Sequence, residues 1–239
     1  MEELFFKFSN LSKYPEIIHG MSTRAYGNMK FDQNSDEAVE KNRKIFFKDL
    51  GIGAKKIVVA SQSHGTKIVT VNNIGDNFDS TDGLVTNQKG IFLMIIIGDC
   101  LPVMIYDPLN QIVGIIHAGW RGIINQIIPK AVGKFINLGS EPINLIIGVG
   151  PAICQKHFVV KDEVLKTFKD SYPQATFVRN HDGYVDLKKA VLLDLKYYKI
   201  PKHNIEISSD CPACSNGIYG SFRKEGNSAP MQVAVIGMR

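Results

Sequence analysis

Short apolar runs in the middle of the chain form its most regular hydrophobic pattern. The run Ile91–Ile97 is unbroken, too short to span a membrane and rich in isoleucine, which predicts a strand covered on both faces. Two further runs, 103–106 and 111–116, flank residues 107–110, whose sequence DPLN has the residue preferences of a type I turn. We therefore predict a buried hairpin in this part of the chain.

The spacing of apolar residues changes directly after the hairpin. From Gly122 to Gly139 the apolar positions follow a helical stripe, and Gly139 is typical of a C-terminal cap. Residues 117–122, HAGWRG, are therefore predicted to form a strand-to-helix turn. Its glycines allow a ligand to approach the backbone closely, and the N-terminus of a helix favours an anion.

The rest of the chain is predicted to contain more strands than helices. Helical patterns lie at 35–50, 160–172 and 187–198, and strand patterns at 4–8, 17–24, 56–60, 67–71, 143–149, 205–207 and 231–237. Strands and helices do not alternate regularly, and no repeat or linker divides the sequence. We therefore expect one α+β domain with mixed sheets over residues 1–239, in preference to a doubly wound sheet.

Composition narrows the class of protein. With 239 residues, 44% apolar and 21% charged, the chain has the composition of a globular protein with an ample core. The net charge of +5 is spread without a dense basic block, so we infer neither nucleic-acid nor membrane binding, although small anions such as phosphate would be attracted. The apolar piece near the N-terminus is too short for a signal peptide. Four cysteines are too few for a disulfide framework, which predicts a cytoplasmic location.

Three residues with metal-ligating side chains lie at predicted strand ends close to glycine. His64, Cys100 and His117 together offer two imidazoles and a thiolate. Three protein ligands leave the fourth tetrahedral position open, as a catalytic zinc ion requires, and copper suits the same donors. The alternative is that the thiol is a packing group and that each histidine is an ordinary hydrogen-bonded residue.

The remaining cysteines have a less informative pattern. Cys211 and Cys214 have the spacing of half a zinc ribbon or of a redox pair, but no second CxxC or HxxxH completes either motif, so a structural turn is favoured. Cys154 is interpreted as a packing residue. His157 has no partner at ligand spacing and is interpreted as a surface or supporting residue.

Three arginines lie among glycine or serine residues in predicted loops. There a guanidinium group can bind phosphate through two parallel hydrogen bonds. A solvated loop arginine is an equally good interpretation for each residue taken singly. These residues are Arg24, Arg121 and Arg223.

Taken together, the motifs resemble the laccase-domain (YfiH-like) proteins over nearly the whole chain. The combination of HAGWRG with an upstream DCxP and QxHG is very specific. The matching motifs, in chain order, are Ser22-Thr23-Arg24, Gln62-Ser63-His64-Gly65, Asp82 to Thr86, Gly98-Asp99-Cys100-Leu101-Pro102, His117 to Gly122, Gly150-Pro151, Cys211-x-x-Cys214 and Ser221-Phe222-Arg223.

The resemblance implies a four-layered α/β/β/α sandwich with zinc bound by His64, Cys100 and His117. It implies a purine nucleoside phosphorylase that also deaminates adenosine and cleaves methylthioadenosine, with purine nucleosides and phosphate as its partners. Asp99 is then expected to assist proton transfer, and Gln62 and the three arginines to bind substrate or phosphate. Monomer and dimer both remain open.

Three other functions are compatible with the same residues. A metal-free hydrolase or deamidase would use Cys100 as nucleophile and His117 as base. A non-catalytic zinc module would need a fourth protein ligand. A multicopper polyphenol oxidase, the older family label, would need many imidazoles, typically in His-x-His pairs, whereas this chain has six histidines and no such pair.

Overall fold

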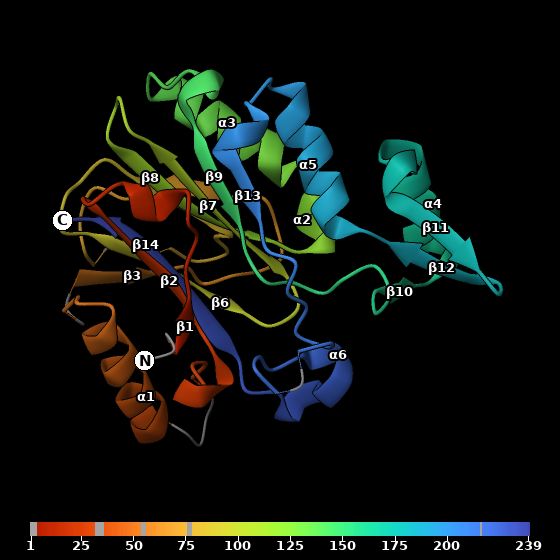
Figure 1. Cartoon of the computed structure of the whole chain (residues 1–239), viewed down its shortest axis with the longest axis horizontal. Coiled ribbons are helices and arrows are strands. Elements are labelled where there is room, and N and C mark those ends of the chain that lie inside the picture. Colours follow the sequence, from red (N-terminus) through yellow and green to blue (C-terminus); the bar gives the residue numbers. More distant parts are fainter. Residues whose placement is uncertain (1–3, 32–35, 54–55, 76–77, 216) are drawn as a thin grey trace.

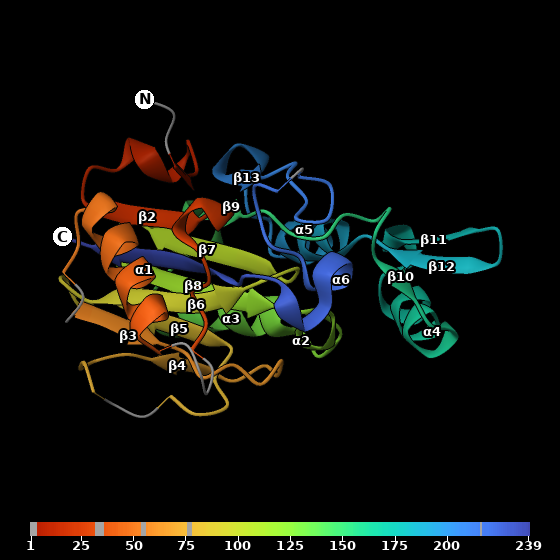
Figure 2. The ribbon, with the colours of Figure 1, turned by 90° about the horizontal axis from the view of Figure 1, so that it is seen from below.

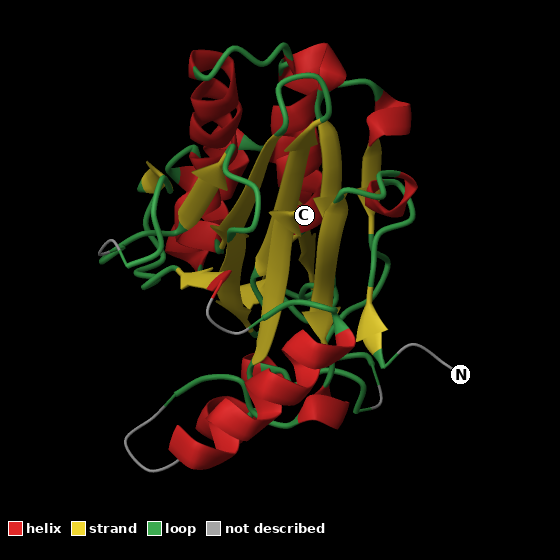
Figure 3. Cartoon of the chain, turned by 90° about the vertical axis from the view of Figure 1, so that its left-hand side faces the viewer, coloured by secondary structure: helices red, strands yellow, loops and turns green. Residues whose placement is uncertain are grey.

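Two large β-sheets lie face to face between layers of helices in the computed structural model (Figures 1 and 3). The structure describes residues 4–31, 36–53, 56–75, 78–215 and 217–239. Both large sheets contain parallel and antiparallel strand pairs. The predicted α+β class with mixed sheets is therefore confirmed.

The larger sheet has six strands in the order β13-β9-β7-β8-β5-β4. Its centre is the antiparallel hairpin of β7 and β8, the hairpin that the apolar runs and the DPLN turn predict. At that turn the Asp107 carboxylate accepts the backbone N–H groups of Leu109 and Asn110 at 2.9 and 3.2 Å. The strands are β4 (Ile68–Thr70), β5 (Gly83–Thr86), β7 (Leu101–Asp107), β8 (Ile112–Ala118), β9 (Ile146–Val149) and β13 (Ile205–Ile207).

The second sheet has five strands in the order β1-β2-β14-β6-β3. The apolar run at 91–97 forms β6 of this sheet, so the chain crosses from one sheet to the other at residues 98–100, just before the hairpin. The crossing places Asp99 and Cys100 at the edge where both sheets end. The strands are β1 (Phe5–Phe6), β2 (Ile17–Ser22), β3 (Ile57–Val59), β6 (Phe92–Ile97) and β14 (Gln232–Met238).

Three apolar cores separate four layers, in the α/β/β/α order that the family resemblance implied. One core lies between the two sheets. A second lies between the five-stranded sheet and α1 (Asp36–Asp49). The third lies under α2 (Trp120–Ile124), α3 (Ile127–Asn137) and α5 (Leu187–Tyr197), which cover the six-stranded sheet. Figure 1 shows α1 on one side of the strands and α3 and α5 on the other.

The sequence pattern predicted one helix from 122 to 139, but the structure shows two. The backbone breaks at Gln126, whose φ is 67°, and α2 and α3 lie on either side of it. The Gln126 side-chain amide donates to the Tyr172 hydroxyl at 3.0 Å at this break. Ile123 on α2 and Ile127 on α3 are both buried against the same sheet. The apolar pattern therefore continues across the break, and the break could not be recognised from the sequence.

A small lobe projects from one end of the sandwich (Figures 1 and 2). It consists of α4 (Asp162–Ser171) and a three-stranded sheet in the order β10-β12-β11. The strands are β10 (Val159–Val160), β11 (Thr176–Arg179) and β12 (Asp182–Val185). The sequence pattern missed this sheet because three of the four β11 residues are exposed and form no buried apolar run.

No helix in the described part of the chain is long and apolar enough to cross a membrane.

Asp194, a buried carboxyl group on α5, is expected to make stability depend on pH. Its two oxygens lie 3.1 Å from the Tyr172 hydroxyl, and burial, only partly offset by that hydrogen bond, raises the pKa of Asp194 to about 6. The folded protein therefore binds this proton more tightly than the unfolded chain, where the pKa is about 4. The resulting stabilisation is fully present below about pH 4 and is lost as the pH rises through 6, by about 3 kcal/mol in total.

The Asp194→Asn variant should lack this loss of stability. Urea unfolding measured from pH 4 to 7.5 should give a free energy of unfolding that changes less with pH in the variant than in the wild type. Asp170→Asn, at an exposed position on α4, controls for the loss of one negative charge. Parallel curves for wild type and Asp194→Asn would contradict the assignment.

Candidate active site

The strand register brings the thiol and the second imidazole together at the open end of the β7–β8 hairpin. Pro102 on β7 lies opposite His117 on β8, so Cys100, two residues earlier, reaches the same end. β5 pairs with β8 with Gly83 opposite Ile116, which places Asp82 beside His117. The backbone N–H of His117 donates to the Asp82 carbonyl at 2.7 Å.

His64 completes the cluster from the loop that precedes β4. One ligand atom from each of His64, Cys100 and His117 can be chosen so that all lie within 4.8 Å of one another. The two imidazole rings meet edge to face, with their centroids 4.8 Å apart. Three residues spread over more than 50 positions of the sequence thus form one compact group of two nitrogens and one sulfur.

A buried carboxylate, Asp82, holds this cluster in place. It accepts a hydrogen bond from Nδ1 of His117 at 2.8 Å and lies completely out of solvent. It also accepts the backbone N–H groups of Ser63, His64 and Gly65 at 3.2, 2.9 and 2.7 Å, which fixes the loop that carries His64. The sequence analysis placed Asp82 in a motif but gave it no role, because its contact with His117 depends on the pairing of β5 with β8.

Hydrogen bonds dominate the electrostatics of the cluster. Burial alone would raise the pKa of Asp82, but the hydrogen bonds from His117, Gly65 and Ser63 lower it to about 2. Burial disfavours the charged form of His117, yet Asp82 and Cys100 raise the pKa of its imidazole to about 9. Burial likewise opposes a thiolate, while His117 and His64 lower the pKa of Cys100 to about 7. The site therefore favours an ionised thiol, a form that binds metal ions.

The donor set fits a metal ion. Because Nδ1 of His117 is held by Asp82, its Nε2 remains as the ligand atom, an arrangement common around zinc. A Cβ atom at Gly119 would lie 3.2 Å from the Cys100 sulfur and 3.3 Å from Cδ2 of His64, so glycine leaves room beside the cluster. Two nitrogens and one sulfur suit zinc or copper.

The cluster opens onto a cavity of about 830 Å³. Six of the eight site residues predicted from the sequence line it: Gln62, His64, Asp99, Cys100, His117 and Arg223. Arg24 and Arg121 lie outside its lining. The Arg24 guanidinium pairs with Glu225 at 2.6 Å, and that of Arg121 lies 4.4 Å from the centre of the neighbouring Trp120 ring. Their roles in anion binding stay predictions.

The cavity wall is built by side chains that bond to the backbone. Both ends of the Gln62 amide pair with the backbone of Ile96 on β6, at 2.8 and 2.7 Å. The Asp99 carboxylate accepts the Ser221 hydroxyl and the Arg223 N–H, each at 2.7 Å, and so anchors the short helix α6 (Phe222–Glu225). Both Asp99 oxygens therefore already accept a hydrogen bond.

Several lining residues were not singled out from the sequence. Phe158 is buried beneath the Arg223 guanidinium, which lies 5.2 Å from the ring centre, whereas Phe222 is 56% exposed at the rim. Lys30 adds a second basic side chain. The motif Ser221-Phe222-Arg223 contained a signal for Phe222, but nothing in the sequence pattern places Lys30 or Phe158 at this cavity.

A second group of metal-ligating residues lies beside this wall. Ligand atoms of Cys154, His157, Cys211 and Cys214 lie within 4.8 Å of one another. The interpretation that no second pair of ligands accompanies Cys211 and Cys214 is therefore wrong. The interpretation that His157 has no partner is wrong as well. The second pair is Cys154 and His157, whose CxxH spacing matches neither a CxxC nor an HxxxH motif.

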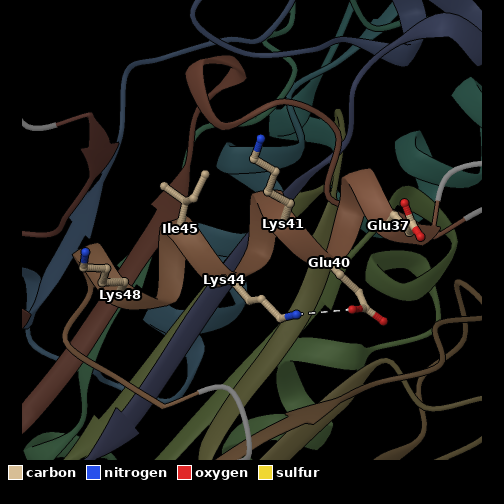
Figure 4. A pocket seen from close by; sticks show the side chains of 6 residues that line it. All are labelled: Glu37, Glu40, Lys41, Lys44, Ile45 and Lys48. Atoms are coloured by element: carbon tan, nitrogen blue, oxygen red, sulfur yellow. Dashed lines mark hydrogen bonds and ion pairs between the residues drawn. The ribbon is translucent and has the colours of Figure 1, made fainter.

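A hollow along α1 shows no comparable chemistry (Figure 4). Its lining consists of charged residues and one isoleucine on the exposed side of the helix: Glu37, Glu40, Lys41, Lys44, Ile45 and Lys48. Its one drawn ion pair, between Lys44 and Glu40, spans 3.4 Å between side chains that are both well exposed. Exposed pairs four residues apart on a helix are ordinary surface features.

Solved structures and sequence relatives agree on the class to which this fold and site belong. The crystal structure of the Bacillus licheniformis protein YfiH superposes with a TM-score of 0.89 at 26% identity, covering 99% of this chain and all of that one. The family model described as multi-copper polyphenol oxidoreductase laccase matches residues 17–239. The chain belongs to this family.

Relatives of this chain have names that describe two activities. A protein of Deinococcus radiodurans, named purine nucleoside phosphorylase, is 33% identical over 221 residues, which cover 92% of this chain and 85% of the relative. A protein from an unknown prokaryotic organism, named adenosine deaminase RL5, is 29% identical over 191 residues, covering 74% of this chain and 73% of the relative.

Proposed function

We propose that this protein is a metal-dependent purine nucleoside phosphorylase that also deaminates adenosine. The observation that carries the proposal is the array of Asp82, His117, Cys100 and His64, which opens onto a cavity of about 830 Å³. The names of the two relatives support the choice of reaction. Phosphorolysis would convert adenosine, inosine, guanosine or methylthioadenosine and phosphate into the free base and the 1-phosphate of its sugar.

The three residues His64, Cys100 and His117 would hold the metal ion, for which we propose zinc, with copper as a competitor for the same donors. When bound, zinc supplies a Lewis acid that polarises a substrate oxygen or lowers the pKa of water. Asp82 keeps the proton of His117 on Nδ1 and so keeps Nε2 free. Its hydrogen bonds to residues 63–65 hold His64 in position.

The rest of the cavity offers groups that can bind the purine base and the phosphate. Phe222, which is well exposed at the rim, offers an aromatic surface on which a purine base can stack. Lys30 and Arg223 are cations at the same cavity, and we propose that they bind phosphate. Asp99 orients Arg223 through the backbone N–H of that residue. The role of Asp99 in proton transfer stays a prediction.

An oxidase of the multicopper type fits this donor set poorly. Such enzymes need many imidazoles. The chain has six histidines, and the ligand clusters found in its described part contain two of them in one case and one in the other. We therefore do not extend the oxidoreductase in the family's description to this chain.

A Cys-His hydrolase is the alternative function that one observation favours. The ligand atoms of Cys100 and His117 lie within 4.8 Å of each other, and each residue shifts the pKa of the other toward the thiolate–imidazolium pair that a nucleophile and its base would form. That mechanism has no use for His64, which the Asp82 hydrogen bonds hold beside the other two. The metal-dependent reading uses all three residues.

Product analysis with adenosine tests the proposed function. Wild-type protein incubated with adenosine and phosphate should release adenine and ribose-1-phosphate, and adenine should not form without phosphate. Any deaminase activity would appear as inosine in both cases. His117→Ala should form neither product, whereas His203→Ala, at an exposed position outside both clusters, should match the wild type. Metal-replete wild-type protein without turnover of adenosine would refute the proposal.

A further inference from the structure

We propose that Cys154, His157, Cys211 and Cys214 form a second metal site, which binds zinc as a structural ion. The four side chains come from two loops, one that follows β9 and one that follows β13. Three thiolates and one imidazole are a common ligand set of structural zinc. Four protein ligands leave no open position, so this site differs in kind from the three-residue cluster in the cavity.

The distances between the ligand atoms match a tetrahedron around zinc. With Zn–S near 2.3 Å and Zn–N near 2.05 Å, tetrahedral geometry places two sulfurs about 3.8 Å apart and a sulfur and a nitrogen about 3.6 Å apart. The sulfurs of Cys154 and Cys214 are 3.7 Å apart. Nδ1 of His157 lies 3.4, 3.9 and 3.3 Å from the sulfurs of Cys154, Cys211 and Cys214.

Both ligand pairs have the same backbone turn. The N–H of His157 donates to the carbonyl of Cys154 at 3.0 Å, and the N–H of Cys214 donates to the carbonyl of Cys211, also at 3.0 Å. In each case the fourth residue of the turn bonds back to the first, so both side chains of the pair face one point. Two such turns facing each other supply four ligands without rearrangement of the backbone.

The surroundings stabilise the negative charge that the site would carry. Zinc with three thiolates and a neutral imidazole has one net negative charge. The backbone N–H of Cys154 donates to the Cys211 sulfur at 3.2 Å. The Lys188 ammonium group lies close by, held at 2.6 and 2.8 Å by the carbonyls of Ser208 and Asp210, directly before Cys211. Hydrogen bonds and a cation around the ligands are what a metal–thiolate site needs.

The ion would tie the loop that follows β13 to a loop that forms part of the cavity wall. Ile153 and Phe158, on either side of the Cys154–His157 turn, both line the cavity of the first site. The N–H of Ile153 donates to the Asp99 carbonyl at 2.9 Å, and Nη1 of Arg223 donates to the His157 carbonyl at 2.8 Å. Loss of the ion should therefore loosen the wall that contacts substrate, although the ion itself touches no substrate.

A disulfide is the alternative for these thiols, and the structure contains none among the four cysteines. A disulfide would bring two sulfurs to about 2.05 Å from each other. It would not explain why His157 and the third sulfur lie beside them. The near-equal spacing of all three sulfurs around one imidazole nitrogen favours a common central ion.

The test is metal content in the reduced, full-length protein supplied with zinc and dialysed. Wild type should retain two equivalents per chain by elemental analysis. Cys214→Ser, at an exposed position, should retain one, and His117→Ala should retain one at the other site. His203→Ala, a histidine outside both clusters, should retain two. With cobalt in place of zinc, His117→Ala should keep most of the thiolate-to-cobalt absorption of the wild type, because the second site contributes three of the four thiolates.

Stability gives a second readout that does not depend on catalysis. Zinc should raise the melting temperature of His117→Ala, which keeps the second site, more than that of Cys214→Ser. A single equivalent in reduced wild type that Cys214→Ser keeps and His117→Ala loses, or two equivalents in Cys214→Ser, would overturn the proposal. A disulfide among these cysteines in protein isolated without reductant, with no zinc bound by His117→Ala after reduction, would overturn it as well.

Discussion

Replacing Asp82 with asparagine should weaken metal binding at the first site by one to two powers of ten and destabilise the fold. The carboxylate, which lies completely out of solvent, accepts hydrogen bonds from His117 and from three successive backbone N–H groups. Asparagine offers one acceptor atom and one donor group in the same space, so its NH₂ group would face another donor. Loss of such a partner to a metal-binding histidine typically costs 10–100-fold in affinity or activity.

The cost in stability should be about 3 kcal/mol, because buried donors lose an ionised acceptor. Zinc titration with a competing chelator measures the affinity, and urea unfolding of the metal-free proteins measures the stability. Asp182→Asn, at an exposed position on β12, is the matched control and should change neither quantity. An Asp82→Asn affinity within twofold of the wild-type value would show that this carboxylate does not support the site.

The sequence predicted the local part of the site well. The two apolar runs and the DPLN turn indicated the hairpin, and an antiparallel hairpin places the residues before its first strand next to those at the end of its second. Cys100 and His117 therefore had to lie close together. These pairings depend on neighbouring residues and on turn chemistry, both of which can be read along the chain.

The non-local part of the site could not be derived in this way. Asp82 meets His117 only because β5 pairs with β8 in one particular register, and a shift by one residue would turn the carboxylate to the other face. The second cluster depends on the parallel pairing of β9 with β13, which places two loops more than 50 residues apart in sequence at the same sheet edge. Periodicity predicts that strands exist but not which of them are neighbours.

The same limit applies to the arginines. Arg24 was predicted in a loop suited to an anion, yet it begins a short 3-10 helix and its guanidinium pairs with Glu225, about 200 residues later. Arg223 was predicted in an equally polar loop, but it lies on α6 and lines the cavity, because Asp99 and the carbonyls of His157 and Val159 hold it there. Sequence context alone did not separate the two, since each depends on a partner from a distant segment.

Removing the metal should lower adenosine turnover by at least about a thousandfold. A Lewis acid contributes several kcal/mol of transition-state stabilisation, and about 4 kcal/mol corresponds to three powers of ten in rate. Dialysis against a strong chelator followed by a rate measurement tests this, and one equivalent of zinc above that needed by the second cluster should restore the activity. Circular dichroism of the metal-free protein shows whether the fold survives the treatment.

The same experiment separates the metal-dependent enzyme from the Cys-His hydrolase. A thiol nucleophile with an imidazole base needs no metal, so the metal-free protein would keep its activity and lose it only when Cys100 is alkylated. The Cys214→Ser variant keeps His64, Cys100 and His117 and should still respond to zinc, which assigns the response to the first cluster. Folded, metal-free protein that turns over adenosine at the wild-type rate would exclude the proposed role of these three residues as metal ligands in catalysis. The chemistry would then pass to the Cys100–His117 pair, and His64 would only help to position it.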